Sequence, residues 1–141
     1  MSAATAPASS APSTNLNRAL WAVQGLLAVA FTGAGLTKLT TPIAELVPKM
    51  GWVLDMPEIA VRLIGASEVA GAVGLLAPSL LRIAPKLTPL AAALLAVVMV
   101  LGAGVHLQRG EAGILPVNLV LGGLSLFVAW GRAKAVPIAA K

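Results

Sequence analysis

The chain has 141 residues, of which 58% are hydrophobic and 11% are charged, with a net charge of +5 and a mean hydropathy of +0.92. A soluble domain carries about 25% charged residues, so this composition excludes an ordinary soluble protein and indicates a membrane protein. The basic residues are scattered between apolar runs, which excludes a nucleic-acid surface. The lack of cysteine excludes disulfides, thiolate metal sites and thiol redox chemistry within the chain.

Residues 1–15 consist mainly of Ala, Ser, Pro and Thr and carry no charge, a composition that predicts a disordered tail. They lack the basic start and apolar block of a secretory signal. The apolar run that follows is long for a cleaved signal and is better interpreted as an uncleaved anchor. We interpret residues 1–15 and 136–141 as cytoplasmic tails and residues 16–135 as the membrane domain.

Four apolar runs, each near the roughly 20 residues that a helix needs to cross the hydrocarbon, predict four membrane spans. They are Ala19–Leu36, Ile59–Ala77, Thr88–Leu107 and Ile114–Gly131. Pro78 is predicted to end the second span. Glycines inside the runs predict close helix packing. The predicted fold is an all-α integral membrane four-helix bundle.

The first outer loop, residues 40–56, is not an ordinary polar connection. Ile43, Leu46, Val47 and Met50 recur at helical spacing within it. This pattern predicts a short amphipathic interfacial helix, lying on the membrane surface or covering the bundle.

Charge counting predicts the orientation. With four spans, six positive residues and no acidic ones lie on the side of the two termini, and they are Arg18, Arg82, Lys86, Arg132, Lys134 and Lys141. The other side carries four basic and five acidic residues. Because positive loops stay inside, both termini are predicted to be cytoplasmic. Arg109 and Glu111, on the outer side, are interpreted as a solvated loop.

Glu68 is the principal candidate for function. It is the tenth of 19 residues in the second span, which puts its carboxyl group about 14 Å from either boundary. A carboxylate at the midplane costs roughly 2.5 kcal/mol or more, so it normally faces a protein interior or a cavity. A purely structural hydrogen-bonding role for Glu68 is the alternative.

Further polar residues lie between the outer surface and Glu68. The helical rise puts Asn118 and Arg62 roughly 7–9 Å outward of the midplane, and Lys38 and His106 roughly 13–16 Å. The inner half is mostly apolar, which predicts a vestibule closed beneath Glu68. The candidate ligand-binding residues are therefore Glu68, Arg62, Lys38, Asn118 and His106.

The partner of Glu68 follows from these depths. Arg62 is predicted to pair with Glu58, four residues before it on the same helix. Glu68 is then expected to meet Asn118 or Thr32, or to be protonated if no cation reaches it. Lys38 is equally well interpreted as a snorkelling anchor, and His106 as an interfacial histidine without chemistry. One histidine cannot make a metal site with ligands this sparse, and no catalytic residue is assigned.

Four segments resemble the DoxX-like family of small four-span bacterial membrane proteins. They are Phe31–Lys38, Arg62–Pro78, Val105–Glu111 and Trp130–Arg132. The resemblance implies a location in the bacterial inner membrane. Some relatives are small subunits of sulfur- or thiol-linked quinone oxidoreductase complexes, while this chain lacks cysteine. The absence of cysteine therefore favours a role with a partner subunit or a quinone pocket over direct thiol chemistry.

Three functions fit these observations. The first is a membrane subunit of a redox complex that binds a quinone or lipid-like ligand near Glu68, with an oxidoreductase subunit or a second copy as partner. The second is a small proton- or cation-coupled transporter. The third is a non-catalytic assembly factor. The sequence does not decide whether the chain is an enzyme by itself.

Overall fold

The computed structural model describes residues 10–141, with side chains from Thr14 onward. Its elements are α1 (Ser10–Thr40), α2 (Ile43–Leu46), η1 (Gly51–Asp55), α3 (Glu58–Leu81), α4 (Leu87–Gln108), η2 (Ala112–Ile114), α5 (Leu115–Trp130) and η3 (Gly131–Ala135). Four helical segments are long and apolar enough to cross a membrane, which confirms the predicted all-α four-helix bundle.

The predicted disordered tail falls partly outside the described residues, which begin at residue 10. Within them, α1 already begins at Ser10, so residues 10–15 are helical rather than irregular. The helix continues through residues that the composition assigned to the tail because Ala and Ser are compatible with helical backbone.

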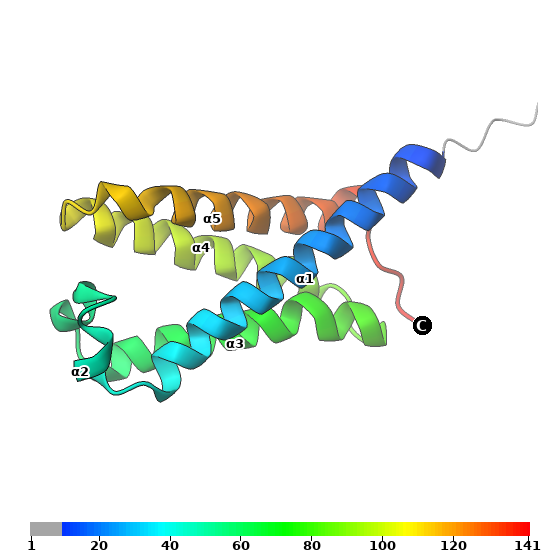
Figure 1. Cartoon of the computed structure of the whole chain (residues 1–141). Helices are drawn as coiled ribbons and strands as arrows, with labels where there is room; N and C mark the ends of the chain where they lie inside the picture. The colour runs from blue at the N-terminus through cyan, green and yellow to red at the C-terminus, as the bar shows by residue number, and fades with distance from the viewer. Residues whose placement is uncertain (1–9) are drawn as a thin grey trace, which may run out of the picture.

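The helices form two pairs (Figure 1). Helix α1 packs along α3, and α4 packs along α5, while α3 and α4 join the pairs. The two helix pairs are in contact at the end of the bundle where the chain termini lie, and they separate toward the end that carries α2. We call these ends the inner end and the outer end. The main core lies where the pairs meet and includes Leu27, Phe31, Leu75, Leu95 and Val128.

The outer cap, formed by α2 and η1, packs on the beginning of α3. Leu46 and Val53 are buried against Val61. The predicted amphipathic helix is thus present as two short turns that share one apolar cluster, interrupted near Pro48, whose ring removes a backbone donor.

The sequence predicted that Pro78 ends the second span. Instead, Pro78 lies inside α3, which continues to Leu81. A proline lacks an N–H, so the carbonyl four residues earlier, that of Gly74, loses its helical donor. The Thr88 hydroxyl of α4 donates to this carbonyl at 2.9 Å, and Ser79 Oγ lies 2.7 Å from Thr88 Oγ1. Side chains of a neighbouring helix therefore compensate for the proline, as they can within a membrane.

The predicted role of the glycines holds at some positions and fails at others. A Cβ atom on Gly35 would lie 2.7 Å from the carbonyl oxygen of Gly65, and the reverse distance is also 2.7 Å. These two residues therefore bring α1 and α3 into backbone contact. By contrast, Gly33, Gly104 and Gly123 have open space where a Cβ atom would lie, so helix packing does not require glycine at these positions.

We expect Gly35→Ala to lower the free energy of unfolding by roughly 1–3 kcal/mol, because the added methyl group meets rigid backbone. Gly33→Ala is the matched control on the same helix, and it should be neutral or slightly stabilising, because alanine favours helix over glycine. Unfolding by denaturing detergent, followed by circular dichroism, measures both variants. Equal effects of the two substitutions would argue against the close crossing.

Candidate functional site

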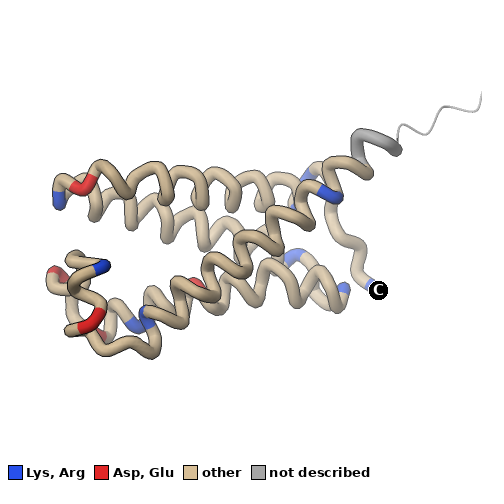
Figure 2. The backbone as a smooth tube through the Cα atoms, viewed as in Figure 1, with Lys and Arg blue, Asp and Glu red and all other residues tan. Residues whose placement is uncertain are grey.

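Charge is divided unevenly between the ends of the bundle (Figure 2). At the inner end, the described charged residues are all basic, and at the outer end basic and acidic residues are mixed. Between the two ends, the interior of the bundle holds the ion pair of Lys38 and Glu68.

Lys38 and Glu68 form a buried ion pair between α1 and α3. The Nζ atom lies 2.8 Å from Glu68 Oε1, and the two side chains are 11% and 2% exposed. The expectation that Glu68 would meet Asn118 or Thr32 is therefore wrong, and so is the interpretation of Lys38 as a snorkelling anchor. The tight crossing explains the difference: Lys38 Cβ lies 2.8 Å from where a Gly65 Cβ atom would be, so the lysine side chain starts against α3.

Arg62 holds the backbone next to this pair. Its Nη1 atom donates to the carbonyl oxygens of Lys38 and Thr41, both at 2.7 Å. Carbonyls at a helix C-terminus lack helical partners, so a guanidinium here ties the end of α1 to α3. Arg62 Nη2 also lies 2.8 Å from Glu58 Oε1, which confirms the predicted pairing of these two residues.

Asn118 and His106 lie on the other helix pair. Asn118 Nδ2 donates to the carbonyl oxygen of Met99 at 3.1 Å, next to Gly102. His106 Nδ1 lies 3.1 Å from Glu111 Oε1. The five candidate residues thus form separate groups: Lys38, Glu68 and Arg62 are in contact, whereas Asn118 and His106 bond within the α4–α5 pair.

Asp55, His106, Arg109 and Glu111 form what we call the outer clasp. Arg109 pairs with Asp55 of η1, and its Nε atom lies 3.0 Å from Glu111 Oε1. A Cβ atom on Gly51 would lie 2.7 Å from Arg109 Nη2, so the end of the arginine side chain lies directly over this glycine. The clasp joins the outer cap to the α4–α5 connection. Arg109 and Glu111 are thus accessible to solvent, as the sequence suggested, and they also connect this loop to the outer cap.

The hydrogen bond with His106, together with Arg109, holds the pKa of the Glu111 carboxyl below its usual value. The hydrogen bond to Asp55 raises the pKa of Arg109 further above its ordinary value. The lowered pKa favours the charged form of Glu111 within the outer clasp.

A second polar network, at the inner end, was not foreseen from the sequence. Arg132 Nε donates to Gln24 Oε1 at 2.7 Å, and its Nη1 donates to Asn17 Oδ1 at 2.7 Å. Gln24 Nε2 donates in turn to the carbonyl oxygen of Leu75 in α3. The inner half is thus mostly apolar, as predicted, but it also contains a buried hydrogen-bond network around Arg132. A basic residue at a span boundary normally reports topology, so the residue type alone gave no indication that Arg132 is buried.

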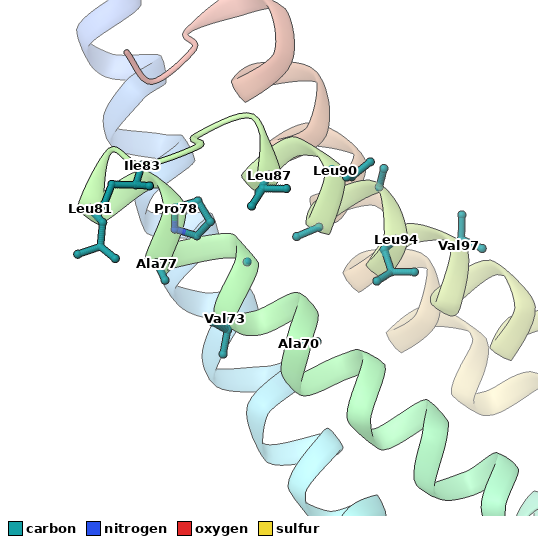
Figure 3. A pocket seen from close by; sticks show the side chains of 13 residues that line it. Ala70, Val73, Ala77, Pro78, Leu81, Ile83, Leu87, Leu90, Leu94 and Val97 are labelled. Atoms are coloured by element: carbon teal, nitrogen blue, oxygen red, sulfur yellow. The ribbon is translucent and has the colours of Figure 1, made fainter. Parts of the chain in front are cut away.

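Glu68, which is only 1% exposed, lines neither of two pockets on the surface. An apolar groove of about 760 Å³ runs between α3 and α4 toward the inner end, with Val73, Leu81, Leu87 and Leu94 on its walls (Figure 3). A mixed pocket of about 420 Å³ lies at the inner end itself. The groove lacks reactive groups, so its chemistry is that of a surface for hydrocarbon chains.

The buried ion pair makes a quantitative prediction. Lys38→Met should lower the free energy of unfolding by roughly 3–5 kcal/mol, because it leaves a carboxylate uncompensated, whereas Lys38→Met with Glu68→Gln should recover most of the loss. Detergent-induced unfolding measures both. Lys49→Met, at an exposed lysine of the outer loop, is the control. If the single and double variants lose the same stability, the pair is not coupled.

The outer clasp predicts a pH response. Since folding lowers the Glu111 pKa, the contribution of the clasp is present above the usual carboxyl pKa and is lost as pH falls through the lowered one. Spin labels at Glu45→Cys and Ala112→Cys should keep one distance from neutral pH down to the usual carboxyl range, and then separate. The absence of native cysteine makes the labelling specific.

Arg109→Gln should separate the same labels at neutral pH, because Asp55 and Glu111 then lose their shared cation. Labels at Leu80→Cys and Lys134→Cys, at the inner end, serve as the control and should not move. An unchanged outer distance in Arg109→Gln would show that other contacts close this end.

No curated protein and no solved structure matches the chain. A model of the DoxX-like family matches residues 22–128, a range that begins in α1, ends in α5 and contains the Lys38–Glu68 pair and the outer clasp. The match covers more than half of the chain, and the four apolar helices agree with it. The protein therefore belongs to the DoxX-like family and is a membrane protein.

Proposed function

We propose that this protein is a small inner-membrane subunit of a redox complex, and that it binds a quinone or a lipid with a polar head in the outer half of the bilayer. The observation that carries this proposal is the buried ion pair of Lys38 and Glu68. Intramembrane ionisable residues are rare and commonly mark sites for ligands or protons.

Stability alone is a poor explanation for the pair. Removing two charges from water costs several kcal/mol per ion, and replacing a buried pair with apolar residues is often neutral or stabilising. Arg62 adds a third charged side chain at the same crossing. Such an arrangement is costly to keep in a membrane, which favours a role in binding over a role in packing.

The pair offers hydrogen bonding and proton exchange. Lys38 Nζ can donate to a carbonyl or anionic oxygen of a ligand, and Glu68 can give up or take a proton when the lysine turns toward the ligand. Asn118 and His106, on the facing helix pair, would line the same outer half of the bilayer.

A redox reaction requires a partner. Reduction of a quinone to a quinol takes two electrons and two protons; protons would pass through Glu68, and an oxidoreductase partner would supply the electrons. Gly33 and Gly123 face outward with open space beside them, so a partner helix, or a second copy of the chain, can approach there closely.

The charge distribution supports an orientation. The inner end carries the basic residues Arg18, Arg82 and Lys134, and the positive-inside rule assigns this end, with both termini, to the cytoplasm. The Lys38–Glu68 pair would then lie toward the periplasmic half of a bacterial inner membrane.

Quinone titration in lipid nanodiscs, read by native mass spectrometry, tests the proposal. We expect Glu68→Gln and Lys38→Met each to weaken binding roughly tenfold, because one charged hydrogen bond is worth roughly 1.5–3 kcal/mol. Glu45→Gln, at an exposed carboxylate of the outer cap, should bind as the unaltered protein does.

Equal quinone binding by all variants would exclude the site. A proton flux across liposomes that requires Glu68 and no quinone would favour the transporter, since a buried carboxylate–ammonium pair can also load and release a proton. A stable complex with an oxidoreductase that survives Glu68→Gln would favour the assembly factor.

A further inference from the structure

The mixed pocket at the inner end has no part in the function proposed above. We call it the inner pocket; it has a volume of about 420 Å³ and lies between the start of α1, the end of α3 and the C-terminal segment. Its polar lining comes from Thr14, Asn17, Ser79 and Arg82, and its apolar lining includes Trp21 and Ile138.

A buried cation lies against the wall of this pocket. Arg132 is 3% exposed, its Nη1 bonds Asn17 and the carbonyl oxygen of Val136, and its guanidinium carbon lies 5.1 Å from the centre of the Trp21 ring. These three contacts are all lining residues of the inner pocket. Among residues 14–141, Arg132 forms no ion pair with a carboxylate, and its Nη2 atom has no hydrogen-bond partner.

A buried guanidinium without an anion is costly, because the charge leaves water and nothing of opposite sign compensates it. The neighbouring charges at this end, such as Arg82 and Lys86, are also positive. The field at the inner pocket therefore favours an anion.

The rim of the pocket is held in an unusual conformation. Arg82 and Ala84 have φ angles of 55° and 49°, in the left-handed region that non-glycine residues rarely adopt. The C-terminal segment clamps this turn: Arg82 Nε donates to the carbonyl oxygen of Ala139 at 2.8 Å, and the Lys141 amide donates to that of Arg82 at 3.1 Å. Such strain persists where surrounding contacts fix it, and it is common at ligand clamps.

We propose that the inner pocket binds the phosphate of an anionic phospholipid. The pocket lies at the ends of the spans, where lipid headgroups are found, and Trp21 and Ile138 give it an apolar rim. The α3–α4 turn places Arg82 in the inner pocket and its neighbours Leu81 and Ile83 in the apolar groove (Figure 3). One lipid can therefore seat its headgroup in the pocket and a hydrocarbon chain in the groove.

The test uses the full-length protein in vesicles of phosphatidylglycerol or of phosphatidylcholine, followed by native mass spectrometry of retained lipid. The unaltered protein should retain phosphatidylglycerol preferentially. Arg82→Gln should lower that preference roughly tenfold, through loss of a charged phosphate contact. Lys134→Gln, which removes the same charge from an exposed site at the same end, is the matched control and should have no effect.

Since Arg82 also clamps the C-terminal segment, a second variant separates binding from folding. Thr14→Trp fills the pocket from an exposed position of α1 without changing charge, and it should abolish the preference as well. Both variants should unfold as the unaltered protein does in phosphatidylcholine. Equal loss in Arg82→Gln and Lys134→Gln, an unaffected Thr14→Trp, or displacement of the lipid by millimolar inorganic phosphate would overturn the proposal.

Discussion

The contact between Gly35 and Gly65 is the constraint on which the interior of this protein depends. Two glycines let the backbones of α1 and α3 touch, and this contact starts the Lys38 side chain against α3, within reach of Glu68. Any larger residue at either position would push the helices apart, and the lysine would then extend toward the membrane surface, where lysines usually lie. Helix packing and the buried charges are thus one arrangement, because the ion pair exists only where the crossing is closest.

The two ends of the bundle are joined by different kinds of contact. At the inner end, Gln24 connects α1, α3 and the η3 turn through buried hydrogen bonds, and the apolar core surrounds them. At the outer end, the clasp joins the helix pairs through charged side chains that are partly exposed, such as Asp55 and Arg109. Exposed ion pairs contribute little, roughly 0–1 kcal/mol, whereas buried packing contributes much more. The outer end is therefore the end that opens at the lower cost.

The sequence was sufficient for features that depend on periodicity and composition. The four spans, the amphipathic cap and the Glu58–Arg62 pair each follow from spacing along one segment, and the structure confirms them. Features that depend on which helices touch could not be derived this way. The partner of Glu68 required the α1–α3 crossing angle, and Pro78 could continue its helix only because Thr88 of α4 supplies a donor. The depth of a residue along a span gives its position along the membrane normal. It does not give the direction in which the side chain faces, and so does not identify its neighbours.

The burial of Arg132 shows the same principle at a residue that the sequence analysis used only to predict orientation. Gly131 packs directly against Leu20 of α1, and this contact draws the following arginine into the bundle. A glycine just before a basic residue at a span boundary is a local indication of such an approach, although it identifies no partner. Charge counting treats Arg132 as one of six equivalent positive residues. Arg132 is buried, however, so its charge lies inside the bundle and not in water. Polar groups of α1, the C-terminal segment, or an anion from outside the chain must compensate this charge. In the proposed lipid site, the same positive charge would both orient the protein in the membrane and select the lipid that surrounds it.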